Sequence, residues 1–208
     1  EANIFVVDKG VGGRFSLWSD FGLALVGSLG TNIYKELLLG AYSMDVHFLT
    51  EEFGSNLPYI LGLTRIWNRN ILEFPSLGII PYGEGLKFFH TWVQQVEMES
   101  NGKNIDTQGI LLRMPAAPTI FGSVGTDAQH SFFQALHQGV EIIPIEIVVP
   151  MISKLSGEEI PDILRGQNEL VINALAQCES LMLGDAEGKD RFRVFKGGRP
   201  STLISWRQ

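Results

Sequence analysis

Two neighbouring acids, Glu97 and Glu99, are the first residues of this 208-residue sequence that could carry chemistry. They stand near the end of a segment, residues 86–100, whose apolar spacing predicts a helix. In a helix Gln95 and Glu99 lie four residues apart and share a face, whereas Glu97 points elsewhere. The Asn and Gly that follow, at positions 101 and 102, predict a left-handed cap that ends the helix.

Glu99 would therefore occupy the last helical turn, where the negative end of the helix dipole opposes a carboxylate by ~0.3–1 kcal/mol. A carboxylate that is less stable in its charged form suits proton abstraction next to a carbonyl group. A solvated acid on an exposed helix face explains the spacing equally simply, and from the spacing alone it is the preferred interpretation.

A glycine-rich turn, residues 10–20 (GVGGRFSLWSD), provides a second candidate. It follows an apolar run that reads as a strand, and Gly12 and Gly13 would let backbone N–H groups approach a ligand. Arg14 could then hold an oxyanion or a phosphate with its fork of donors. The spacing of a dinucleotide fingerprint is absent, and a tight turn with a surface arginine is the equal alternative.

A third candidate is His130, which the pattern places in the first turn of a helix at residues 127–139. Near a helix N-terminus the dipole favours a neutral imidazole, which can take or give a proton near pH 7. His137 lies seven residues later, which is not the spacing of a metal-binding pair, and we interpret it as structural. No metal site is expected.

Composition limits the function classes. The chain is 45% hydrophobic and 19% charged, as in ordinary globular proteins, and its net charge of -7 disfavours nucleic acid as a partner. No apolar run reaches the ~20 residues of a membrane helix, and no signal peptide is recognisable. A single cysteine, Cys178, fits a reducing compartment, so we expect a cytoplasmic protein and assign that thiol no role.

The elements that must position these residues alternate along the chain. Short apolar runs predict strands at residues 3–8, 77–82, 118–123 and 140–150. Helical periodicity predicts helices at residues 31–52, 57–72, 83–100, 127–139 and 159–183. This alternation indicates an α/β fold with a mainly parallel sheet flanked by helices, and residues 184–200 form a polar surface excursion.

Three motifs, in this order, closely resemble the glucose-6-phosphate isomerase family: residues 12–19 (GGRFSLWS), 94–103 (QQVEMESNGK) and 125–139 (GTDAQHSFFQALHQG). Weaker similarities at residues 40–48, 61–70, 79–86 and 197–202 extend the resemblance from Phe5 to Ser201. The resemblance implies a three-layer, flavodoxin-like sugar-isomerase (SIS) domain. It overrides the simpler interpretations given above.

The resemblance also implies an activity, the interconversion of glucose 6-phosphate and fructose 6-phosphate through a cis-enediol, without a metal or an organic cofactor. Glu99 would shuttle the proton between C1 and C2, and Arg14 would stabilise the enediolate. Gln95, Gly12 and Gly13 would contact the substrate. His130 would help to open the sugar ring and, as in the family, would reach the site from the neighbouring subunit of a homodimer.

Two parts of the family enzyme have no match here, the phosphate-binding loop of its first SIS domain and its C-terminal helix. Residues 1–208 therefore resemble the second SIS domain alone, and we expect this piece to be incomplete for catalysis. A stand-alone SIS module that binds a sugar phosphate to regulate another process is the alternative. The presence of Glu99, Arg14 and His130 together favours the enzyme, because a sensor needs no base. We further expect these three side chains to converge on one cleft at an edge of the sheet.

Overall fold

The computed structural model describes residues 6–151, 161–187 and 190–207, without the side chains of residues 161–164 and 207. The chain divides into two compact units, Glu1–Ile66 and Trp67–Gln208, which we call the N-terminal and C-terminal units. No helix in the described parts of the chain is both long and apolar enough to cross a membrane.

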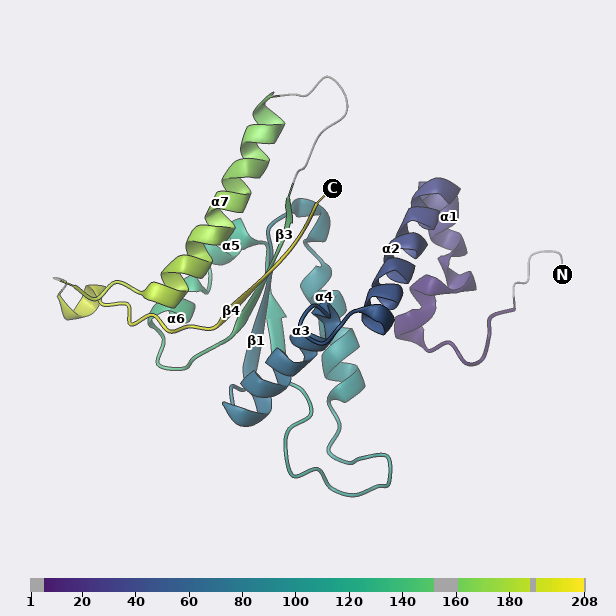
Figure 1. Cartoon of the computed structure of the whole chain (residues 1–208), viewed down its shortest axis with the longest axis horizontal. Coiled ribbons are helices and arrows are strands. Elements are labelled where there is room, and N and C mark those ends of the chain that lie inside the picture. Colours follow the sequence, from purple (N-terminus) through teal and green to yellow (C-terminus); the bar gives the residue numbers. More distant parts are fainter. Residues whose placement is uncertain (1–5, 152–160, 188–189, 208) are drawn as a thin grey trace. The chain divides into compact units, whose positions relative to one another are not determined.

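The C-terminal unit is built on a parallel sheet of four strands in the order β2-β1-β3-β4 (Figure 1). The strands are β1 (Ser76–Pro81), β2 (Thr119–Gly122), β3 (Ile145–Met151) and β4 (Ser201–Arg207). The order places β1 and β3 side by side in the middle, although β2 comes between them in the sequence. Parallel neighbours require crossover connections, and here helices provide them.

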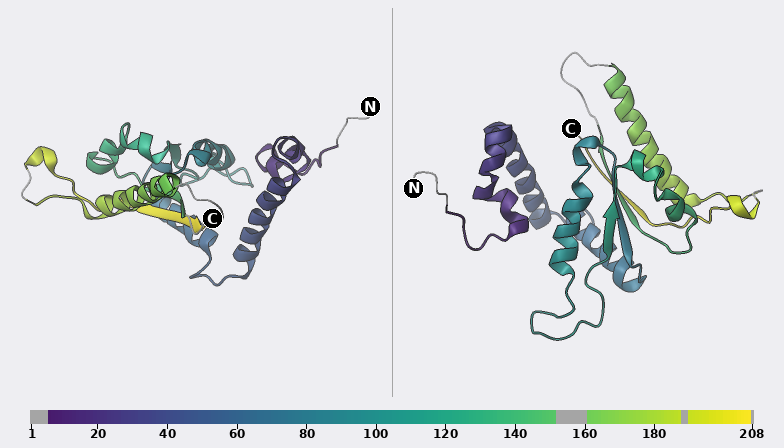
Figure 2. Two further views of the ribbon diagram at one scale, coloured as in Figure 1. Left: turned by 90° about the horizontal axis from the view of Figure 1, so that it is seen from above. Right: turned by 180° about the vertical axis from the view of Figure 1, so that it is seen from behind.

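Helices cover both faces of this sheet. One face carries α4 (Phe89–Gln94), and the other carries α5 (Gly125–Gln129), α6 (Phe133–Gln138) and α7 (Pro161–Leu183) (Figures 1 and 2). Strand β1 shows why, because its side chains alternate between the faces. Ile79 packs with Val93 of α4, whereas Ile80 packs with Ala128 of α5. The predicted α/β fold with a parallel sheet flanked by helices is therefore confirmed.

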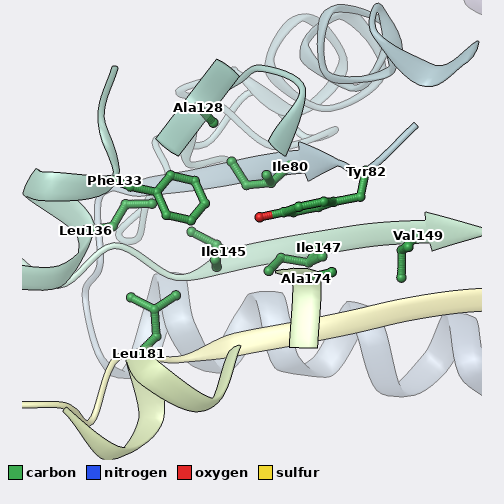
Figure 3. Packing of buried hydrophobic residues seen from close by; sticks show 10 residues of the cluster. All are labelled: Ile80, Tyr82, Ala128, Phe133, Leu136, Ile145, Ile147, Val149, Ala174 and Leu181. Carbon is green, nitrogen blue, oxygen red and sulfur yellow. The ribbon is translucent and has the colours of Figure 1, made fainter. Parts of the chain in front are cut away.

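The larger cluster of buried side chains lies between the sheet and helices α5 to α7 (Figure 3). Its fully buried members include Ile80 of β1, Ile147 of β3 and Ala174 of α7, so one cluster joins segments that are distant in the sequence. Full burial of a side chain the size of Ile147 stabilises the fold by ~1.5–3 kcal/mol. This core fixes the scaffold on which α4 and α5 are held.

The N-terminal unit is helical. It contains two short 3₁₀ helices, Gly13–Trp18 and Asp20–Gly22, followed by α1 (Leu23–Leu29), α2 (Thr31–Thr50) and α3 (Leu57–Ile66). Asn56 caps α3, because its Oδ1 accepts a hydrogen bond from the N–H of Tyr59 at 3.2 Å. The predicted helix at residues 57–72 continues past α3 as a single π-turn, Trp67–Ile71, in the C-terminal unit.

Two expectations about strands differ from the structure. The strand predicted at residues 3–8 is not observed at residues 6–8, which have no regular structure, and residues 3–5 lie outside the described residues. Strand β4 was not predicted, because its sequence STLISWR mixes polar and apolar residues at the edge of the sheet. The assignment of residues 1–208 to one SIS domain stays a prediction.

Candidate active site

The segment that carries Gln95 and Glu99 is a π-turn, Gln95–Glu99, which directly continues α4. The two predicted site residues are the first and last residues of this turn, and both are exposed. Glu97 is partly buried, and its Oε1 accepts a hydrogen bond from Nδ2 of Asn101 at 3.3 Å. Gln95 and Glu99 are thus alike in exposure and differ from Glu97, whereas their position on one shared face stays a prediction. Single π-turns within helices are frequent at functional sites, a signal that periodicity did not reveal.

The end of this helix differs from the prediction. Gly102 does not adopt a left-handed conformation, so the predicted left-handed cap is wrong. Its N–H donates to the carbonyl oxygen of Met98 at 2.8 Å, and a Cβ at position 102 would lie 2.1 Å from that oxygen. Glycine is needed here for close approach rather than for handedness. The ammonium of Lys103 donates to the backbone carbonyl of Glu99 at 2.5 Å and so satisfies one of the terminal carbonyl groups.

His130 occupies a different place from the one predicted. The expected helix at residues 127–139 is broken into α5 and α6, and His130 is the C-cap of α5. Its N–H donates to the carbonyl oxygen of Asp127 at 3.1 Å, and its side chain is exposed. The argument that the N-terminal end of a helix dipole acts on this imidazole is therefore wrong. The exposed position leaves the ring accessible from outside the chain.

Glu99 and His130 belong to segments that pack on opposite faces of the sheet. Val93 and Met98 of the α4 segment pack against Ile79 and Ile120 on one face of the sheet. The α5 segment packs on the opposite face, where Ala128 lies beside Ile80 (Figure 3). The expectation that these side chains converge on one cleft, with His130 coming from the neighbouring subunit, stays a prediction.

Arg14 belongs to the N-terminal unit, in the 3₁₀ helix that begins at Gly13. The hydroxyl of Tyr34, in α2, lies 3.2 Å from the carbonyl oxygen of Leu17 and 3.3 Å from that of Ser19, and it ties the end of this 3₁₀ helix to α2. Among the described residues, nothing lies within 4 Å of a Cβ placed on Gly12 or Gly13. The packing of the described chain thus gives no reason for glycine at these two positions.

A cavity of about 420 Å³ beside the α5 to α7 layer is lined by residues that include Gln129, Phe133, His137, Gln177 and Phe195. Nε2 of His137 lies 2.9 Å from Oε1 of Gln177, and the ring of His137 contacts the ring of Phe195 edge to face. These contacts agree with the structural role predicted for His137. In the described residues no group of three His, Cys, Asp or Glu side chains could hold a metal ion.

Cys178 lies in α7 and packs against the larger cluster. Burial raises the pKa of its thiol, and a hydrogen bond with Ser201 opposes that rise. A raised pKa leaves little thiolate at neutral pH, so the thiol is a poor nucleophile. This agrees with the decision to assign Cys178 no role.

Comparison with known proteins gives one consistent result. A sequence model of the phosphoglucose isomerase family matches residues 1–208. The glucose-6-phosphate isomerase of Chlorobium phaeobacteroides is 41% identical over 98% of this chain, and that of Albidiferax ferrireducens is 42% identical over 93%. These matches span 39% and 36% of the two relatives, so the chain spans about two fifths of their length.

Solved structures agree. The crystal structure of a glucose-6-phosphate isomerase from Chlamydia trachomatis matches 98% of this chain and 40% of that protein, with a TM-score of 0.87 and 37% identity. A hypothetical protein from Thermus thermophilus matches 95% of this chain and 44% of that protein, with a TM-score of 0.70 and 23% identity, a likeness that concerns the fold alone. With a family model that covers every residue and relatives about 40% identical across the same span, the chain belongs to the phosphoglucose isomerase family.

Proposed function

We propose that this chain is the second SIS domain of a cytoplasmic glucose-6-phosphate isomerase, which interconverts glucose 6-phosphate and fructose 6-phosphate. The observation that carries the proposal is the family match over residues 1–208, which includes all three candidate segments. The exposed Glu99 at the end of a π-turn supports it, because a base must be accessible to a substrate. The reaction proposed here uses neither a metal nor an organic cofactor.

In the proposed mechanism, the carboxylate of Glu99 removes the proton from C2 of the open-chain aldose. The electron pair of that C–H bond forms the C1–C2 double bond of a cis-enediol, and negative charge develops on the former carbonyl oxygen. Transfer of the proton of the C2 hydroxyl to the oxygen on C1, and protonation of C1 by Glu99, give the ketose with its carbonyl at C2 and a hydroxyl at C1. Arg14 stabilises the oxyanion, as positively charged donors do where charge develops.

Substrate contacts are assigned to Gln95, Gly12 and Gly13. Gln95 stands at the other end of the π-turn from Glu99, and both side chains are exposed. The open space beside Gly12 and Gly13 leaves room for a ligand to approach their backbone. The chain spans about two fifths of its relatives, so we propose that the phosphate of the substrate is bound elsewhere in the full-length protein.

We also propose a homodimer in which each site takes Glu99 from one subunit and His130 from the other. The support is geometric, because α4 and α5 lie on opposite faces of the sheet while both side chains are exposed. If inactive Glu99→Gln and His130→Ala full-length proteins are mixed and allowed to exchange subunits, mixed dimers should recover part of the activity. No recovery, with exchange verified by tagged subunits, would contradict the shared site.

The decisive test of the proposed function is the substitution Glu99→Gln in the full-length protein, followed in a coupled isomerase assay. Loss of the general base should lower kcat by ~10²–10⁴ while fructose 6-phosphate still binds. The matched control is Glu97→Gln, which neutralises an acid two residues away that is partly buried and bonded to Asn101. Near-normal turnover by the Glu99 variant would remove Glu99 as the base.

The same assay separates the enzyme from the regulatory alternative. A sensor would bind the sugar phosphate without turnover, even in the unmodified full-length protein. Measured on the 208-residue chain alone, activity equal to that of the full-length protein would contradict the proposal that this piece is incomplete.

A further inference from the structure

The free edge of β2 is closed by side chains from the helix that carries Glu99. Strand β2 lies at one end of the sheet order, so one side of its backbone has no neighbour among the described strands. The N–H of Thr119 donates to the carbonyl oxygen of Pro75, in the direction of β1. Because backbone groups alternate along a strand, the N–H and C=O of Ile120 point to the opposite, free side.

Both of these groups of Ile120 are bonded to side chains of the α4 segment. Nε2 of Gln94 donates to the carbonyl oxygen of Ile120 at 2.9 Å. The N–H of Ile120 lies 3.3 Å from Sδ of Met98 and donates to it. An unpaired buried backbone group costs ~1–3 kcal/mol, so these two contacts complete the strand edge that no other strand reaches.

The positions of these two residues are informative. Gln94 immediately precedes the π-turn, and Met98 immediately precedes its last residue, Glu99. Each residue bonded to Ile120 is thus followed by one of the exposed residues, Gln95 and Glu99. Thioether sulfur is a weak acceptor, and leucine would fill the same apolar space, so packing alone does not explain a methionine that meets a backbone N–H.

From this geometry we infer that Gln94 and Met98 are positioning residues, which hold the π-turn to the edge of β2 at both ends and so fix the carboxylate of Glu99. The inference rests on the proposed function, in which Glu99 is the base. A turn that side-chain contacts hold at both ends keeps its shape better than a free one. A carboxylate misplaced by about 1 Å can lose ~10²-fold in rate.

The test compares three variants of the full-length protein: Met98→Leu, Met98→Gln and Val93→Ala. Leucine removes the acceptor and keeps the apolar volume, whereas glutamine keeps the length and offers an oxygen acceptor. Val93 lies on the same helix as Met98 and packs against Ile79 of β1, but it makes neither hydrogen bond to Ile120. Its truncation therefore reports ordinary loss of packing. For each variant, kcat, KM, Tm and the hydrogen exchange rate of the Ile120 amide are measured.

If Met98 positions Glu99, the Leu variant should lose ~10-fold or more in kcat with KM within about twofold. Its Ile120 amide should exchange faster, while Tm changes little. The Gln variant should keep more of kcat than the Leu variant, because glutamine still offers an acceptor. If Met98 acted only through packing, the Leu variant would keep more of kcat. Val93→Ala should lower Tm and leave kcat near normal at a temperature where it is folded.

The inference would be overturned by unchanged kcat in Met98→Leu despite faster exchange at Ile120, or by unchanged exchange at Ile120. A parallel loss of kcat in Val93→Ala and Met98→Leu at equal Tm would overturn it as well, because packing would then suffice. The proposed function fails separately, through an active Glu99→Gln protein. The exchange of the Ile120 amide does not depend on activity, so the two failures can be told apart.

Discussion

The two units of this chain differ in how far their apolar side chains are buried. In the C-terminal unit Ile79, Ile80 and Ile147 are completely buried. In the N-terminal unit Leu39 is 63% exposed and Leu49 is 80% exposed, although both belong to a helix of 20 residues. The buried residues that the structure describes in the N-terminal unit are Gly22 and Asn56. The C-terminal unit therefore has a buried apolar core, whereas apolar residues of the N-terminal unit are exposed.

This difference separates the candidate site residues by the kind of scaffold that holds them. Glu99 and His130 stand on helices that pack on a closed sheet, whereas Arg14 stands in a unit with little buried surface. Helices gain most of their stability from burial of an apolar face, and large exposed apolar patches mark surfaces that bind something. We therefore expect the turn with Arg14 to depend on contacts from outside the described residues.

Amide hydrogen exchange on the 208-residue chain should show the largest effect. We expect amides in β1 and β3 to open only with the global unfolding of the C-terminal unit, and those in α2 to open locally. We expect exchange in α2 to be faster by ~10³-fold or more, because a difference of about 4 kcal/mol in opening free energy corresponds to that ratio. Equal protection in the two units would contradict the comparison.

A pair of alanine substitutions gives a smaller and more local effect. Ile147→Ala removes a completely buried side chain from β3 and should lower the free energy of unfolding by ~2–5 kcal/mol. Leu39→Ala removes an exposed side chain of α2 and should change it by less than ~0.5 kcal/mol. Urea unfolding followed by circular dichroism measures both. A comparable loss in the two variants would mean that α2 is buried in solution.

Much of the C-terminal unit could be predicted from sequence because its signals are local. The apolar runs at residues 77–82, 118–123 and 140–150 become β1, β2 and β3, and the long pattern at 159–183 becomes α7 over Pro161–Leu183. Strand β4 was not predicted from the sequence. An edge strand is less completely covered than a central one, so its sequence mixes polar and apolar residues. Register and strand order depend on distant contacts that no local pattern contains.

The candidate site shows the same limit. Helical spacing predicted that Gln95 and Glu99 share a face, but it did not predict the π-turn between them, because a π-turn needs one inserted residue rather than a distinct composition. The break at His130 was missed for a related reason. The apolar spacing continues across residues 127–139, although the backbone leaves the helix at the C-cap of α5. Gly102 was correctly singled out but for the wrong reason, since close approach to Met98 rather than handedness requires it.

The smallest predicted effect concerns pH and distinguishes a buried tyrosine from an exposed one. Tyr82 follows β1 and is completely buried, and its hydroxyl accepts a hydrogen bond from Nε2 of Gln129 at 3.1 Å. Burial raises the pKa of the Tyr82 phenol, an effect that the hydrogen bond with Gln129 partly opposes. The folded chain therefore keeps the phenol proton at a pH where the unfolded chain has begun to lose it.

The sign of the effect follows from this difference. Above about pH 10, the ordinary pKa of tyrosine, the unfolded chain binds fewer protons than the folded chain, so the free energy of unfolding falls as pH rises. At pH 7, Tyr82→Phe should lower the free energy of unfolding by ~0.5–1.5 kcal/mol through the lost hydrogen bond. The gap in this free energy between the variant and the unmodified chain should narrow between pH 9 and 10.5, a range of about 1.5 units around the ordinary tyrosine pKa. Tyr42→Phe in the N-terminal unit is the control, because that side chain is 66% exposed and solvated in both states. Urea unfolding at each pH measures the gap. A gap that stays constant for Tyr82 would mean that its hydroxyl is in contact with water, and the closed core would then be less complete than its burial indicates.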